Sequence, residues 1–359
     1  MKYGLIYYKN TENLGDDILS YAGKQFLPQV DYYIDRENMD LFLPEEKEYV
    51  AAILNGWYIH YSYTFPPSPY LIPFFTGAYF NRDTLIYGDY SYLDEYAVDY
   101  MKKFAPIGCR DQHTADVLNE KGIESYFSGC LTLTLRKFQD VEPNHAVILT
   151  DVSERIIKHI ENLLNGKPVI SWTHRFTKEE KGWDSWEKRE ERLEKYLRAY
   201  QGADLVVTTR LHCALPCIAL GTPVILIVNR NDDYHNRIES FSGFCACFSE
   251  EELLGGLADS MLVNYPNNQT PHQLVEEMKK GVNQFIADMS SHPQDIARLP
   301  EISLYREMYM ERGNSMRRAL ETLLVKQDIM VHNFACERQK DMEMMESVMA
   351  LAKKVADKI

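Results

Sequence analysis

The stretch Asp204–Ile225, DLVVTTRLHCALPCIALGTPVI, combines the two hydrophobic patterns that decide the fold. Leu205–Thr208 is a short, β-branched run that is typical of a buried parallel strand. A helix rich in small residues is expected over Leu211–Leu220, with Thr209 as its N-cap and Gly221 just beyond its end. Another apolar run follows Gly221, so the stretch predicts a strand–helix–strand unit of a parallel sheet.

Similar runs recur on both sides of this unit and extend the alternation. Further strands are expected at Leu5–Tyr8, Tyr32–Ile34, Val50–Leu54, Leu85–Tyr87, Ile107–Cys109, Ser125–Phe127, Ala146–Thr150, Val169–Trp172, Val224–Val228 and Cys245–Phe248. Further helices are expected at Asp16–Phe26, Leu93–Phe104, His113–Lys121, Ser153–Leu164 and Trp186–Tyr200. Strands that alternate with helices in this way build βαβ units. The sequence therefore predicts an α/β fold with two Rossmann-like domains that face each other across a cleft.

Changes in composition set the expected domain boundaries. The polar stretch Gln139–Asn144 separates the two series of strands. We therefore expect one Rossmann-like domain over residues 1–140 and a second, with the Arg-Leu-His segment, over residues 141–265. Ser303–Ile359 has no proline, one glycine and eight of the fourteen methionines, which favours a helical extension over residues 266–359. Methionine-rich helices pack a core or a subunit interface, so homo-oligomerisation through this extension is one alternative.

The charge balance excludes two classes of partner. The chain has 359 residues, with 39 Lys and Arg against 53 Asp and Glu, and a formal net charge of −14. Binding to nucleic acids or to a membrane surface through a polybasic face needs the opposite balance. A few clustered arginines can still bind an anionic small molecule. We expect a cytoplasmic protein without an integral membrane segment, because no apolar run fits a signal peptide or a spanning helix.

The seven cysteines show no metal-binding pattern. Cys213 and Cys217, and Cys245 and Cys247, lack a further pair at zinc-ribbon spacing. Free thiols in a reducing compartment are therefore expected. No grid of histidines and carboxylates calls for a catalytic metal, so we expect neither a metal nor a bound cofactor.

The strongest candidate site lies where the strand of the opening stretch meets its helix. Arg210 and His212 fall in the first turn of that helix, where unpaired N–H groups and the dipole attract an anion. A basic pair there opposes the dipole, so a functional reason is expected for it. Because a histidine titrates near neutral pH, His212 can act as an acid or a base. The alternative is a core histidine beside a surface arginine.

Two earlier strand ends supply further candidates. Arg110 follows a strand at the carboxyl edge of a sheet, and its planar fork suits phosphate or carboxylate. An ion pair with Asp111, or a helix cap, would explain it as well. Asn13, Gly15 and Asp16 occupy the turn into the first helix, where backbone N–H groups can meet a ligand. Capping and compensation of the dipole are the alternative there.

Three weaker candidates follow strands of the second domain. His174 comes directly after one strand and could reach the same edge. His235 and Arg237 follow the strand that begins at Val224 and could complete an anion site. A solvated loop explains this last pair equally well.

Together these segments resemble the polysaccharide pyruvyl transferase family. The matching motifs, in the family's order, are Asn13-Leu14-Gly15-Asp16, Arg110-Asp111, and Thr209-Arg210-Leu211-His212 followed by Gly221-Thr222-Pro223. The Arg-Leu-His segment in its strand-to-helix setting is the most specific of them. The resemblance implies a two-domain fold similar to that of the GT-B glycosyltransferases. It also implies phosphoenolpyruvate as donor and a sugar of a surface polysaccharide, or of its precursor, as acceptor.

The resemblance further implies residue roles. Arg110 and Arg210 would bind the anionic groups of the donor, and His212 would be the general acid/base. A lipid-linked acceptor would bring the protein to the inner face of the membrane. Two alternatives stay open: a GT-B glycosyltransferase with Arg210 on the diphosphate of a nucleotide-sugar, and a non-catalytic binding or scaffold protein whose helical tail recruits partners.

Overall fold

The structure is a computed structural model that describes residues 1–46, 48–58, 65–80, 95–176, 185–229 and 238–291, together with residues 327 and 345. All the elements named below belong to one compact unit, formed by residues 1–81 and 93–298, and residues 82–92 and 299–359 are grouped in a second. The expected strand Leu85–Tyr87 and the candidates His235 and Arg237 lie outside the described residues, as does nearly all of the methionine-rich segment.

The first sheet is parallel, with the strand order β2-β1-β3-β5. Its strands are β1 (Lys2–Tyr7), β2 (Tyr32–Asp35), β3 (Val50–Leu54) and β5 (Leu71–Phe75). β3 is buried along its whole length, as an apolar run in the interior of a parallel sheet should be. The sequence pattern did not indicate β5, because Pro73 interrupts its apolar run. The structure places β5 at the sheet edge, where a strand tolerates a missing N–H.

Two short pairs of parallel strands also belong to this half of the chain, and Arg110 directly follows one of these strands. They are formed by β4 (Trp57–Tyr58) with β6 (Tyr79–Phe80) and by β7 (Ile107–Cys109) with β8 (Ser125–Phe127). The helices of this half are α1 (Leu14–Lys24), η1 (Arg36–Leu41), α2 (Glu95–Lys103), α3 (Gln112–Glu120) and η3 (Leu131–Thr134). The N–H of Arg110 donates to the carbonyl of Ala78, with 2.8 Å between N and O. This bond ties Arg110 to the end of the small paired strands.

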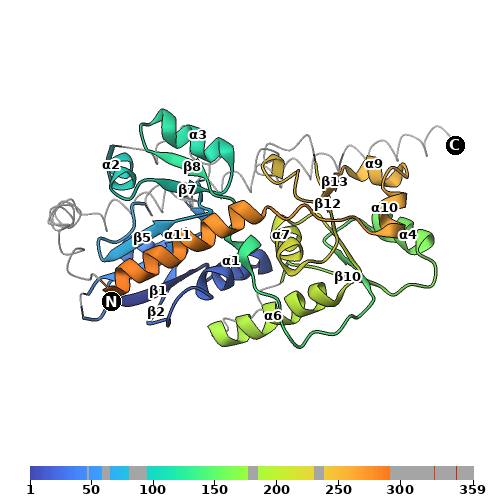
Figure 1. Cartoon of the computed structure of the whole chain (residues 1–359), viewed down its shortest axis with the longest axis horizontal. Helices are drawn as coiled ribbons and strands as arrows, with labels where there is room; N and C mark the ends of the chain where they lie inside the picture. Colours follow the sequence, from blue (N-terminus) through green and yellow to red (C-terminus); the bar gives the residue numbers. More distant parts are fainter. Residues whose placement is uncertain are drawn as a thin grey trace. The chain divides into compact units, whose positions relative to one another are not determined.

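The second sheet is also parallel, with the strand order β10-β9-β11-β12-β13. Its strands are β9 (Val147–Thr150), β10 (Val169–Trp172), β11 (Leu205–Thr208), β12 (Val224–Ile227) and β13 (Ala246–Phe248). Its helices are α4 (Glu154–Leu163), α6 (Trp186–Gly202), α7 (Leu211–Leu220), α9 (Glu250–Leu254) and α10 (Asp259–Asn264). The two parallel sheets with their helices confirm the predicted α/β class (Figure 1).

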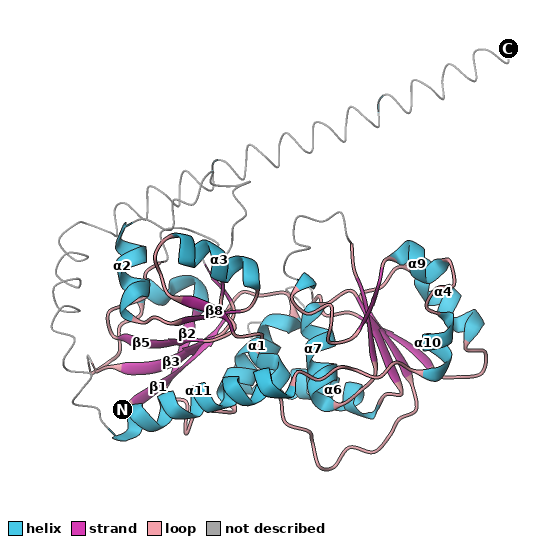
Figure 2. Cartoon of the chain, turned by 45° about the horizontal axis from the view of Figure 1, so that its top comes forward, coloured by secondary structure: helices cyan, strands magenta, loops and turns pink. Residues whose placement is uncertain are grey.

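Both faces of the second sheet are buried, and alternate strand residues enter different cores. Ile148 of β9 joins a core shared with α1, α6, α7 and η3. Its neighbours Val147 and Leu149 join a second core with α4, α9 and α10. This period of two follows from the pleat of the strand. Figure 2 shows α6 and α7 on one side of the second sheet and α4, α9 and α10 on the other.

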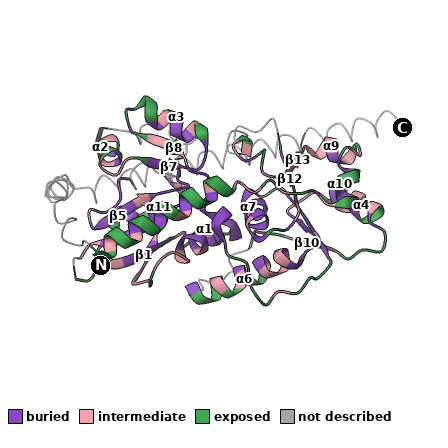
Figure 3. Ribbon diagram, in the orientation of Figure 1, coloured by how far each residue is buried: buried purple, intermediate pink, exposed green. Residues whose placement is uncertain are grey.

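α11 (His272–Ser291) leaves the second sheet and packs against the first. The ring of Phe285 stacks on Phe74 of β5 with 5.2 Å between centroids. The hydroxyls of Ser290 and Tyr3 lie 2.7 Å apart. One side of the helix is buried and the other is exposed (Figure 3). The chain therefore returns to its N-terminal half after the second sheet is complete.

No helix within the described ranges combines the length and the apolar character needed to cross a membrane.

Candidate functional site

α7 begins at Leu211, as its sequence indicates, but Thr209 is not its N-cap. Arg210 occupies that position with extended backbone angles, and no side chain caps the helix. The hydroxyl of Thr209 instead donates to the carbonyl of Asp151, at 2.8 Å. His212 departs from helical geometry within the first turn, with φ −81° and ψ 18°. The start of α7 therefore keeps the uncapped N–H groups that suit an anion.

Arg210 is oriented by Asp151, a residue that the sequence analysis did not single out. Its Nε donates to the Asp151 carboxylate at 2.8 Å. The same carboxylate accepts from the Thr173 hydroxyl at 2.6 Å and from the His174 N–H at 3.0 Å. Burial would raise the pKa of Asp151, but these donors outweigh it and hold the pKa below its ordinary value. The sequence could have pointed to Asp151 through its position, because it directly follows β9 at the sheet edge where Arg210 also lies.

Asp151 has a backbone conformation that supports this role. Its φ of 54° lies in the left-handed region, which asparagine and aspartate adopt more readily than most residues. The turn directs the carboxylate toward both Thr173 and Arg210. The guanidinium is therefore held at one nitrogen, and the side chain remains about a quarter exposed, at 27%.

Arg110 is almost completely enclosed and contacts His212. Its Nη1 lies 3.3 Å from Nε2 of His212, and its side chain is 1% exposed. The guanidinium also lies over the ring of Tyr79, 5.0 Å from its centroid. Its Nε and Nη2 have no hydrogen-bond partner among the described residues. Buried donors are nearly always paired, and two such nitrogens can bind an anion.

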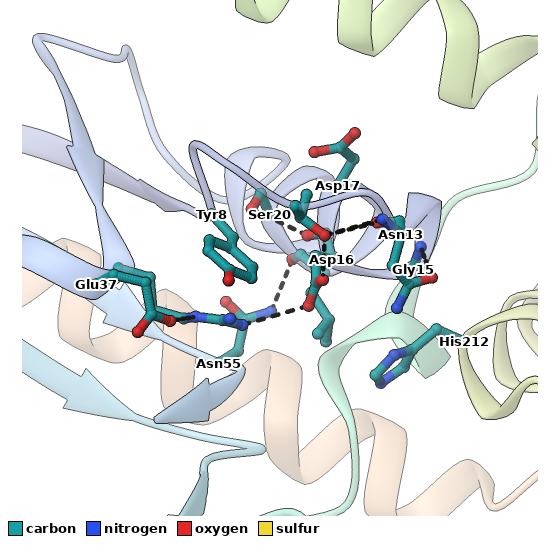
Figure 4. Close-up of polar contacts among 12 residues, drawn as sticks. Tyr8, Asn13, Gly15, Asp16, Asp17, Ser20, Glu37, Asn55 and His212 are labelled. Atoms are coloured by element: carbon teal, nitrogen blue, oxygen red, sulfur yellow. Dashed lines mark hydrogen bonds and ion pairs between the residues drawn. The ribbon is translucent and has the colours of Figure 1, made fainter. Parts of the chain in front are cut away.

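The start of α1 lies against His212. Asn13 caps α1, and its side-chain oxygen accepts from the Gly15 N–H at 3.1 Å. A Cβ on Gly15 would stand 3.0 Å from the Cβ of His212, tighter than ordinary packing allows. Glycine at this position therefore lets the two helix starts approach each other. Figure 4 shows the His212 ring beside Asn13 and Gly15.

Asp16 is bound to an arginine that the sequence analysis also missed. Its carboxylate accepts from Nη1 of Arg36 at 3.3 Å and from the hydroxyl of Thr11 at 2.5 Å. Arg36 is 6% exposed, lies over the ring of Tyr8 at 4.1 Å and also pairs with Glu37. Figure 4 shows Tyr8, Asp16 and Glu37 of this group near one another. In this arrangement Asp16 is a partner of Arg36, at the carboxyl edge of the first sheet.

His174 lies in the interior, away from solvent. It is 0% exposed, and its Nε2 lies 2.8 Å from the hydroxyl of Tyr200. Its carbonyl accepts from the N–H of Leu14, the first residue of α1, at 2.8 Å. An antiparallel bridge pairs Asn13 with Arg175 beside it. The segment that follows β10 therefore fixes the start of α1, and His174 holds its place through Tyr200.

The residues brought together are thus Arg110, His212, Asn13 and Gly15, with Arg210 attached to Asp151 at the same start of α7. Within the described ranges, no group of three or more His, Cys, Asp or Glu side chains could hold a metal ion. The six described cysteines are free. The arrangement offers two helix N-termini, a buried guanidinium and an imidazole. That set can bind an anion and move a proton beside it.

A family model matches the part of the chain that holds these residues. The model of polysaccharide pyruvyl transferase aligns with residues 13–231, well over half of the sequence. The chain belongs to this family. This pyruvyl transferase family member is therefore a transferase, and the resemblance drawn from its three motifs is confirmed. No curated protein matches the sequence.

Three solved structures resemble this chain at low identity. A protein of uncharacterised function from Klebsiella pneumoniae has 15% identity and a TM-score of 0.43. The match covers 69% of this chain and 93% of the Klebsiella chain. A putative UDP-N-acetylglucosamine 2-epimerase from Listeria monocytogenes has 11% identity and a TM-score of 0.42, covering 82% and 98%. The UDP-GlcNAc 2-epimerase from Neisseria meningitidis, bound to UDP-GlcNAc, has 9% identity and a TM-score of 0.41, covering 81% and 98%.

Proposed function

We propose that the protein transfers the pyruvyl group of phosphoenolpyruvate to a sugar of a surface polysaccharide or of its precursor, forming a pyruvate ketal. The observation that carries this proposal is the Arg110 guanidinium, buried beside His212 with two nitrogens that have no partner among the described residues. A planar fork with free donors suits the carboxylate or the phosphate of the donor. Membership of the family supports the same chemistry.

The transfer requires one proton to be delivered and two to be removed. A proton is added to the methylene carbon of phosphoenolpyruvate, which becomes the methyl group of the product. A first sugar hydroxyl then adds to the neighbouring carbon and loses its proton. A second hydroxyl of the same sugar displaces phosphate from that carbon, and its proton ends on phosphate or solvent. One diol and one phosphoenolpyruvate therefore give one ketal and one phosphate.

His212 would move one of these protons. Its ring nitrogen lies 3.3 Å from Arg110, the group that we assign to the donor anion. General acid–base catalysis of this kind contributes about 10²–10⁴-fold in rate. Arg210, held at Nε by Asp151, would offer its remaining nitrogens to the second anionic group of the donor. The uncapped start of α7 adds backbone N–H groups to the same place.

The assignment of His212 makes a direct prediction. His212→Ala should leave the fold intact, because the side chain is only partly buried, and should lower phosphate release by about 10²-fold or more. Phosphate release from phosphoenolpyruvate would be measured with an acceptor glycan, with His272→Ala as the control for an exposed histidine. Unchanged turnover in His212→Ala would remove His212 from the mechanism.

A ligand screen separates this proposal from transfer of a glycosyl group. We expect phosphoenolpyruvate to raise the thermal unfolding midpoint of the wild type, since a ligand that binds the folded state stabilises it. The effect should be lost in Arg110→Gln. Stabilisation by a nucleoside diphosphate, without any by phosphoenolpyruvate, would instead favour a nucleotide-sugar glycosyltransferase.

We further propose that the protein acts in the cytoplasm. If the acceptor is linked to a lipid, the reaction would take place at the inner face of the membrane.

A further inference from the structure

The contact between Arg110 and His212 has a defined direction. A guanidinium nitrogen has no lone pair to offer, so Nη1 of Arg110 donates and Nε2 of His212 accepts. Nε2 therefore carries no proton while the contact holds. In this state His212 is a neutral imidazole that cannot give a proton from Nε2.

An anion at Arg110 changes both partners. Arg110 has two buried nitrogens without partners in the described part of the chain, and an anion attracts the guanidinium with a full negative charge that a neutral imidazole lacks. The guanidinium would therefore turn toward the anion. The negative charge next to His212 would then favour the imidazolium form.

We propose that binding of the donor anion and protonation of His212 are one linked event, in which the anion draws Arg110 away from Nε2 of His212. The site would thus gain its proton only when the donor is present. This inference rests on the proposed function for the identity of the donor, but the linkage applies to any divalent oxyanion that reaches Arg110. Linkage is reciprocal, so a lower pH must tighten binding of the anion.

The other charged groups packed against α7 already have partners. On α1, Asp16 pairs with Arg36 at 3.3 Å. Asp17, also on α1, lies 3.6 Å from Arg189, one of two ionisable side chains that α6 buries. η3, β11 and β12 also pack against α7 and carry no ionisable residues.

Three further ionisable neighbours are bound in the same way. Tyr200, the second ionisable side chain that α6 buries, contacts His174. Arg210 pairs with Asp151 at the start of α7. Asp111, next to Arg110, caps α3 by accepting from the Thr114 N–H at 2.8 Å. Within the described part of the chain, Arg110 is therefore a charged group in contact with His212 whose change of partner would act on it.

The test uses sulfate, which stays divalent throughout the neutral range and so does not titrate itself. Sulfate binding to the full-length protein would be measured by calorimetry from about pH 6 to about pH 9. If one proton is taken up with each anion, the affinity should fall about tenfold per pH unit over part of this range. His212→Gln should bind sulfate with no such dependence on pH, and the control His272→Gln should behave like the wild type.

A spectroscopic measurement keeps the test independent of affinity. In ¹⁵N-histidine-labelled protein, the His212 resonances, assigned by their loss in His212→Gln, should show an unprotonated Nε2 without sulfate and a higher titration midpoint with it. In Arg110→Gln the midpoint should no longer respond to sulfate. An identical His212 midpoint with and without sulfate in the wild type would overturn the linkage.

The two proposals fail in different ways. Proton uptake with sulfate, but no ketal from phosphoenolpyruvate with any glycan, would keep the linkage and remove the proposed function. Ketal formation without proton uptake would keep the function and remove the linkage.

Discussion

Gly15 shows how a single missing side chain can position the group that we propose for proton transfer. Its backbone lies so close to His212 that a Cβ would stand 3.0 Å from the His212 Cβ and 3.3 Å from Nδ1. We expect Gly15→Ala to displace the ring by a few tenths of an ångström and to lower turnover several-fold, because catalysis is sensitive to such shifts. Alanine is also a better helix former than glycine by up to about 1 kcal/mol, so stability should be kept or raised.

The matched control for this variant is Gly243→Ala. Nothing lies within 4 Å of a Cβ added at Gly243. Phosphate release and the urea unfolding midpoint would be measured for both variants. Equal activity in Gly15→Ala and the wild type would show that the close approach to His212 has no catalytic role.

At the scale of elements, α1 and α6 are joined by a buried ion pair. Nη2 of Arg189 on α6 lies 3.6 Å from the Asp17 carboxylate on α1, and the two side chains are 4% and 1% exposed. The same nitrogen donates to the carbonyls of Tyr8 and Lys9, which directly follow β1. Arg189 therefore links the second half of the chain to the end of the first strand.

Removing one member of this pair should destabilise the protein strongly. Arg189→Met breaks the ion pair with the buried Asp17 carboxylate, and removing one member of a buried pair costs about 3–5 kcal/mol. Urea unfolding should show this loss of stability. The double variant Arg189→Met/Asp17→Asn should recover part of the lost stability. Lys195→Met, an exposed position on the same helix, should change stability little. A loss in Arg189→Met no larger than in Lys195→Met would contradict this account.

Elements were more predictable from the sequence than the contacts between them. The β-branched runs such as Leu205–Thr208 form strands because burial on both sheet faces selects such residues. β5 was missed because the position of Pro73 at a sheet edge depends on the neighbouring strands. Thr209 was expected to cap α7, but its hydroxyl contacts Asp151, 58 residues earlier in the chain.

The contacts of the candidate site were also harder to predict from the sequence than its residues. Arg110, Arg210 and His212 could be chosen because each follows or begins an element at the carboxyl edge of a sheet. Their partners Asp151 and Tyr79 are distant in sequence, and no periodicity reveals such pairings. The complete burial of His174 likewise depends on Tyr200, which reaches it from α6.

For the whole molecule, carboxylates in both halves make folding sensitive to acid. Asp31 accepts from the N–H of Tyr3 at 2.9 Å beside β1, and Asp151 accepts from three donors beside the second sheet. For each, burial alone would raise the pKa, yet the hydrogen bonds and nearby positive charge hold it below the ordinary 3.8. Their stabilisation is therefore complete above the unfolded-state pKa and is lost as the pH falls through the lower folded-state pKa.

The loss of stability at acid pH can be tested with the variant Asp151→Asn. At neutral pH the variant should be less stable than the wild type, because its amide cannot attract Arg210 as the carboxylate does. As the pH falls below about 4, protonation of Asp151 in the wild type should reduce the difference in stability between the wild type and the variant. Urea unfolding midpoints over this range would measure it, with the exposed Glu161→Gln as the control. A difference that stays constant down to acid pH would show that Asp151 does not contribute through its charge, and Arg210 would then owe its orientation to the turn at Asp151 alone.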